Sequence, residues 1–223
     1  MWDFRKIDFG NTDAQTESLT NPNLLIDGYY DMENRVKRLL TTSSSFLVLG
    51  YKGSGKTALS EHLYLMSQNS DSIRVEKISL KDLAYKSIVK IVPGNDENET
   101  KAKVAWRWLL LVKSLFALVN DNEAVSDYKA EIDSTSEMFG QCGLFPVNDF
   151  NSLVKVTSSN KFKAQIKNFG FERTQTKENA QYNLELLIDY VKKLLFSFRE
   201  EHQHVIVIDG LDDILTSREI QYT

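Results

Sequence analysis

The hydrophobic and polar positions of the chain follow two periods, which predict strands and helices in alternation. Short apolar runs or strict alternation predict strands at residues 46–49, 73–80 and 204–208. Apolar residues at intervals of three and four predict helices at residues 29–40, 57–68, 101–120, 124–139 and 182–198. Strands that alternate with helices favour an α/β layered fold with a parallel sheet.

Two parts of the chain lack a clear period. Residues 1–28 are polar and irregular, and they predict an N-terminal arm ahead of one domain at residues 29–223. Between Gly140 and Thr176, glycine, proline, asparagine and serine are interspersed among short apolar pairs. That stretch predicts short strands or hairpins.

The composition describes an ordinary folded chain. Of 223 residues, 42% are hydrophobic and 26% are charged, which suffices for a core and excludes a disordered tail. Cys142 is the only cysteine, which excludes an intramolecular disulfide and predicts a reducing, cytoplasmic location. No run approaches the roughly 20 apolar residues that cross a bilayer, so we expect no membrane partner. The net charge of −4 disfavours nucleic acid as a partner.

The predicted strand at 46–49 leads into a segment that matches the phosphate-binding pattern G-x-x-x-x-G-K-[ST] in full. Its glycines permit backbone torsions that turn N–H groups toward one anion, and the following helix presents its positive N-terminus to the same phosphates. Lys56 can reach the β- and γ-phosphates, and the Thr57 hydroxyl can bind Mg²⁺. Lys52 either adds charge there or points into solvent. The predicted nucleotide-binding residues are Gly50, Lys52, Gly53, Ser54, Gly55, Lys56, Thr57 and Ala58.

An acidic half of the site is predicted at the end of the strand 204–208. Asp209 follows that strand directly, where it can hold Mg²⁺ through water. Asp212 and Asp213 come three and four residues later. One of them can orient the attacking water while the other caps the next helix, and the sequence does not choose between them. The guanine-reading N-K-x-D pattern is absent, so ATP is favoured by exclusion.

These segments together resemble a family. The N-terminal Asp8-Phe9-Gly10-Asn11-Thr12-Asp13-Ala14, the glycine-rich segment and the ending Asp209-Gly210-Leu211-Asp212-Asp213 are similar to bacterial P-loop ATPases near the STAND and KAP groups of the AAA-like division. Some of those proteins are encoded with antiphage systems. The resemblance implies a three-layer P-loop NTPase fold with a mostly parallel central sheet, ATP and Mg²⁺ as cofactors, and a homo-oligomer or a partner protein subunit.

The resemblance also implies a strand inserted between the P-loop strand and the strand that ends at Asp209. In that family the inserted strand comes after the acidic strand, and the sequence given stops at Thr223. We therefore expect either a domain that is incomplete at its C-terminal end, with weak or no hydrolysis by this chain alone, or strands that pair in a different order.

The leading hypothesis is a Mg-ATP-binding ATPase module that couples nucleotide binding or slow hydrolysis to conformational change or assembly, with bacterial defence as a setting that the resemblance suggests. Lys56, with Asp212 or Asp213, would carry the catalysis. The alternative is a nucleotide-dependent switch or scaffold that does not hydrolyse. A P-loop kinase would need an arginine-rich lid, and Arg173 stands alone between residues 161 and 177.

Three other features are interpreted as structural. Trp106 and Trp108, on either side of Arg107, are expected to pack in a core, and Cys142 is expected to be inert. The acidic residues 96–99 are expected to lie in a solvated loop.

Overall fold

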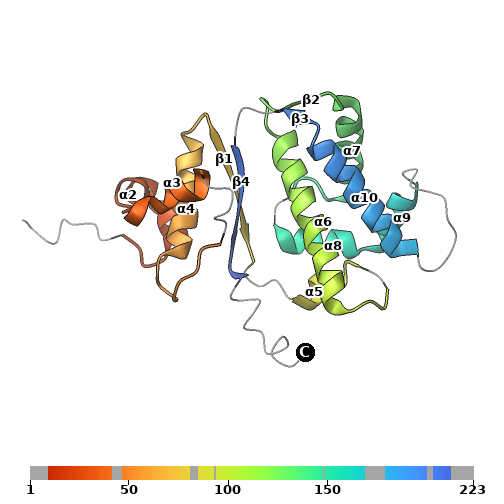
Figure 1. Ribbon diagram of the computed structural model, residues 1–223, viewed down its shortest axis with the longest axis horizontal. Helices are drawn as coiled ribbons and strands as arrows, with labels where there is room; N and C mark the ends of the chain where they lie inside the picture. The colour runs from red at the N-terminus through yellow and green to blue at the C-terminus, as the bar shows by residue number, and fades with distance from the viewer. Residues whose placement is uncertain are drawn as a thin grey trace, which may run out of the picture. The chain divides into compact units, whose positions relative to one another are not determined.

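The computed structural model describes residues 10–41, 47–80, 85–92, 94–147, 149–168, 179–199 and 203–211 (Figure 1). These residues form a mixture of helices and strands with a small, mostly parallel sheet, as the sequence predicts. They divide into two compact units. Unit 1 comprises residues 1–77 and 202–209, and unit 2 comprises residues 78–201 and 210–223.

Unit 1 combines a pair of strands with several helices, two of which precede its other elements in the sequence. Its elements are α1 (Ala14–Thr20), α2 (Pro22–Asp27), the 3-10 helix η2 (Met32–Asn34), α3 (Arg35–Thr41), α4 (Lys56–Gln68), most of β1 (Ile73–Ser79) and β4 (Gln203–Asp209). The prediction that residues 14–27 are irregular is wrong. Asp13 caps α1 by accepting a hydrogen bond from the Thr16 N–H, and Pro22 occupies the first turn of α2, where its missing N–H costs nothing.

The two strands β1 and β4 pair in parallel and confirm two of the predicted strands (Figure 1). The Gln203 N–H donates to the Ser72 carbonyl at 2.9 Å, just ahead of β1. Beside this sheet, Val36 of α3 packs with Leu59 and Leu63 of α4, and Val207 of β4 packs against that cluster. Helix α4 is therefore held against the strand that carries Asp209.

An ion pair with a buried carboxylate joins α4 to the other strand. The Lys77 ammonium of β1 donates to the Glu61 carboxylate of α4 at 2.5 Å, and the Glu61 side chain is only 4% exposed. The same ammonium lies 4.2 Å from the centroid of the Tyr64 ring. Residues 59–63 of α4 are all buried, whereas Met66, nearer the end of the helix, is 43% exposed.

Where the structure describes the predicted strand at 46–49, no strand is present. Residues 47–49 have no strand conformation, and Leu47 and Leu49 are 61% and 83% exposed; Phe46 lies outside the described residues. A strand needs a hydrogen-bonded neighbour, and neither sheet among the described residues includes this segment. The short apolar run was therefore not enough by itself to predict a strand.

Unit 2 is mainly helical. Its elements are α5 (Tyr85–Val89), α6 (Asn98–Val119), β2 (Val125–Ser126), α7 (Lys129–Cys142), α8 (Phe150–Ser158), α9 (Asn160–Asn168), α10 (Asn179–Leu195) and β3 (Phe198–Arg199). Helices α6 and α10 pack side by side (Figure 1). Both were predicted within a few residues. The predicted helix 124–139 begins later, at Lys129, because residues 125 and 126 pair with β3.

The prediction of strands between residues 140 and 176 is wrong where the structure describes that stretch. Helix α8 begins after Asp149, whose carboxylate accepts from the Ser152 N–H and hydroxyl at 2.7 Å each. These bonds hold the pKa of Asp149 below its usual value. Phe150, Leu153, Val154 and Thr157 are buried at helical spacing. Residues 169–178 lie outside the described part.

The core of unit 2 centres on Trp108 of α6, which is fully buried. Its ring meets Phe139 edge-on, with centroids 5.8 Å apart. Its indole N–H donates to the Thr157 hydroxyl at 3.1 Å, and that hydroxyl donates to the Leu153 carbonyl at 2.8 Å. The structural interpretation of Trp108 is therefore confirmed.

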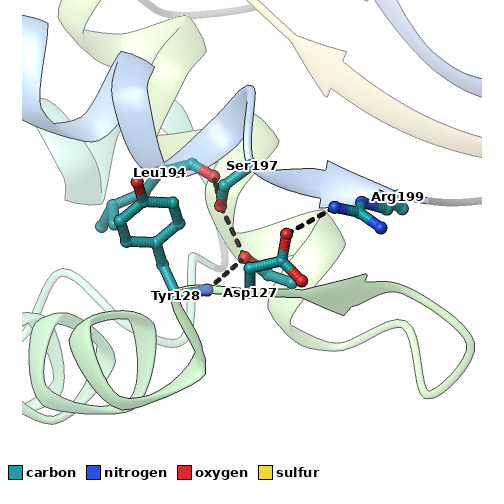
Figure 2. Close-up of polar contacts among 6 residues, drawn as sticks. Asp127, Tyr128, Leu194, Ser197 and Arg199 are labelled. Carbon is teal, nitrogen blue, oxygen red and sulfur yellow. Dashed lines mark hydrogen bonds and ion pairs between the residues drawn. The ribbon is translucent and has the colours of Figure 1, made fainter.

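A short antiparallel ribbon, β2 with β3, joins the start of α7 to the end of α10 (Figure 2). The Ser126 and Ser197 hydroxyls lie 2.5 Å apart, and Ser126 also accepts from the Tyr128 N–H. The Arg199 guanidinium pairs with the Asp127 carboxylate at 2.5 Å on the exposed side. No helix among the residues that the structure describes is both long and apolar enough to span a bilayer.

Replacing Thr157 by Val should leave the Trp108 N–H buried without an acceptor. The free energy of unfolding should fall by about 1–3 kcal/mol, as is typical for an unsatisfied buried donor. Urea denaturation measures the change, and Thr157→Ser, which keeps the hydroxyl, should be the more stable variant. Equal or greater stability of the Val variant would contradict the importance of this hydrogen bond.

Candidate phosphate-binding site

The glycine-rich segment forms an exposed loop that ends at the first residue of α4. The Ser54 N–H donates to the Tyr51 carbonyl at 3.1 Å and closes a turn. Gly53 and Gly55 have φ values of 81° and 84°, in the left-handed region that favours glycine. Gly55 is the N-cap of α4 and accepts from the Leu59 N–H at 2.9 Å.

At the start of the loop, the chain approaches itself closely. A Cβ atom on Gly50 would lie 2.4 Å from the Ser54 Oγ and 3.3 Å from the Ser54 Cβ, so a side chain at position 50 would require the Ser54 side chain to move. The Lys56 ammonium donates to the Gly50 carbonyl at 2.9 Å and to the Tyr51 carbonyl at 3.1 Å. Lys56 therefore places its positive charge against the loop itself.

The rest of the predicted loop residues differ in exposure. Lys52 and Ser54 are exposed, whereas Lys56, Thr57 and Ala58 are half-buried in the first turn of α4. The N-terminal N–H groups of a helix have no partners within the helix, and its dipole makes that end positive. The loop and the first turn of α4 thus have the features of an anion-binding site.

Asp209 is the last residue of β4 and is half-buried. Gly210 follows with φ 90°, so the chain turns away at the end of the strand. Val207, two residues before Asp209, packs on the cluster that contains Leu59, which lies one helical turn after Lys56. The glycine-rich loop and Asp209, the two parts of the predicted site that the structure describes, therefore both belong to unit 1.

Asp212 and Asp213 lie outside the described residues. Within the described part of the chain, no group of three or more His, Cys, Asp and Glu side chains is placed to hold a metal ion. Cys142 is buried and its thiol donates to the Gln165 Oε1 at 2.9 Å. Burial raises the pKa of this thiol, with Lys161 opposing, which agrees with the interpretation that it is inert.

Sequence reasoning missed two contacts of residues in or near the predicted site. The Glu61–Lys77 pair and the close approach of Gly50 to Ser54 both lie next to predicted site residues. The place of Glu61 between Leu59 and Leu63 of α4 was the available signal for the first. Nothing in the sequence indicated the second.

Comparisons of the chain with protein-family models, with curated proteins and with solved structures found no match in any of the three.

Replacing Gly55 by Ala should destabilise the loop, because its φ of 84° strains any residue with a Cβ even though no atom lies within 4 Å. The expected loss is about 1–2 kcal/mol. Gly140, inside α7 and also in open space, is the matched control: Gly140→Ala should gain about 0.5–1 kcal/mol. Urea denaturation measures the free energy of unfolding of both variants. A change in the same direction for both would contradict the left-handed conformation of Gly55.

Proposed function

We propose that the chain is a Mg-ATP-binding P-loop ATPase module, in which nucleotide binding or slow hydrolysis drives conformational change or assembly. The observation that carries the proposal is the folding of the complete eight-residue pattern as a loop with two left-handed glycines in front of α4. That helix packs against β4, the strand that ends at Asp209. A glycine-rich turn that only joined two elements would require neither Lys56 nor Asp209 at these places.

Each described residue has a definite task in this proposal. The loop N–H groups and the N-terminus of α4 would bind the phosphates, with the Lys56 ammonium neutralising their charge. Thr57 and Asp209 offer a hydroxyl and a carboxylate, the hard oxygen ligands that suit Mg²⁺. Such an ion keeps several waters and binds phosphate oxygens, so it needs no cluster of three acidic side chains. Bound Mg²⁺ would neutralise charge that develops on the phosphates.

The three-layer fold is part of the same proposal. The direct pairing of β4 with β1 is compatible with it, because the resemblance places another strand between the P-loop strand and β4. Supply of the attacking water by Asp212 or Asp213, assembly with identical or partner subunits, a cytoplasmic location and a role in bacterial defence also remain proposals.

Replacing Lys56 by Ala should weaken Mg-ATP binding by roughly tenfold to a hundredfold, since hydrogen bonds from a charged group contribute about 1.5–3 kcal/mol. Isothermal titration calorimetry measures the affinity. Lys155→Ala, which removes an exposed lysine of α8, should bind like the wild type. Equal affinity in all three proteins would refute the nucleotide site, and Lys52→Ala tests whether the second lysine of the loop contributes.

A single-turnover assay distinguishes the ATPase from a switch that only binds ATP. Slow conversion of bound ATP to ADP, abolished in Asp212→Ala or Asp213→Ala with binding retained, is the expected result, because phosphoryl transfer needs an oriented water. Lys56→Ala is the control for contaminating activity. Intact ATP after hours would favour the switch, and unchanged turnover in both aspartate variants would contradict their proposed role.

A further inference from the structure

Most of unit 2, residues 80–201, lies between two strands that are neighbours in one sheet. Strands β1 and β4 pair with each other, yet residues 80–202 separate them and contain helices α5 to α10. A connection between parallel neighbours needs about a dozen residues or more, usually a single helix. We propose that unit 2 is an inserted domain that unfolds as a separate cooperative unit from unit 1, and that the nucleotide stabilises unit 1 alone.

The first support is that unit 2 has a core of its own. Trp108 contacts the rings of Phe139 and Phe162, and Phe139 contacts Phe145 edge-on at 5.3 Å. Helix α10 adds Leu187 and Val191, both fully buried, and it packs along α6. Every one of these contacts joins two residues of unit 2, so their energy contributes to the folding of that unit.

The second support is the ribbon of β2 and β3, which closes unit 2 near its exit (Figure 2). The contacts of Ser126 with Ser197 and of Asp127 with Arg199 hold the end of α10 to the start of α7. The chain begins β4 at Gln203, four residues after Arg199. The helical unit is therefore tied together by its own residues before the chain returns to the sheet.

The third support is the distribution of the predicted site. The loop 50–55, the first turn of α4 and Asp209 all belong to unit 1. Unit 1 also has a core of its own, formed by Val36, Leu59 and Leu63. A ligand stabilises only the structure whose folding creates its site. The statement about the nucleotide rests on the proposed function, whereas the separate unfolding does not.

Native-state hydrogen exchange on the full chain, followed by mass spectrometry of peptides, tests the proposal. The comparison is between peptides of α4 and β4 and peptides of α6 and α10. Thr157→Val should raise the exchange of α6 and α10 amides roughly tenfold and leave α4 and β4 unchanged. Glu61→Ala, which leaves Lys77 without its partner, should do the reverse. Ile132→Val, a milder change in the core of α7, replaces Thr157→Val if that variant does not fold.

Changes confined to the mutated unit support the insertion, and equal changes in both sets of peptides overturn it. A saturating concentration of Mg-ATP is the second arm. It should slow the exchange of α4 and β4 only, and slower exchange in α6 and α10 as well would overturn the claim that the nucleotide stabilises unit 1 alone. If Mg-ATP alters no peptide, the proposed nucleotide site fails, and the two variants still decide whether unit 2 unfolds separately.

Discussion

The pairing of β1 with β4 is the constraint on which the arrangement of unit 1 depends. Residues 80–202 lie between the two strands, so their pairing closes a long loop at an entropic cost. Burial against α4 opposes that cost: Val207 of β4 packs on the cluster of α3 and α4, and Lys77 of β1 pairs with the buried Glu61. This pairing and the packing of Val207 on α3 and α4 together determine where Asp209 lies relative to α4.

The glycine-rich loop shows how much of a site can form from local rules. Left-handed glycines, a helix that starts at Lys56 and the bonds of its ammonium to the Gly50 and Tyr51 carbonyls all involve residues that are close in sequence. The strand expected before the loop behaves differently. Residues 47–49 are exposed and pair with no strand of the described residues. A strand depends on hydrogen bonds to a segment that can lie anywhere in the chain, so local sequence does not reveal its partner.

Prediction from the sequence succeeded where the hydrophobic residues follow one clear period. Helices α4, α6 and α10 and strands β1 and β4 were predicted with small errors at their ends. It failed where helices are short: α8 is marked by its cap at Asp149 and by four buried residues, but the glycines, prolines and serines around it concealed the period. Helix α1 has mostly polar, exposed residues, and α2 is only six residues long with none fully buried, so capping and packing on α4 decide their conformation. For the candidate site, the loop was predictable from residue order, whereas the pairing of Glu61 with Lys77 and the approach of Ser54 to Gly50 were not.

The sequence by itself determined the chemistry: which glycines can adopt left-handed torsions, which lysine and threonine begin the helix, and which aspartate ends the apolar strand. These properties depend on residue type and short spacing. Only the tertiary structure decided that β1 is the neighbour of β4, that α4 packs on β4, and that the helices between the two strands form a unit with its own core. These are contacts between residues far apart in the chain, where packing and loop closure decide the partner and local periodicity is silent.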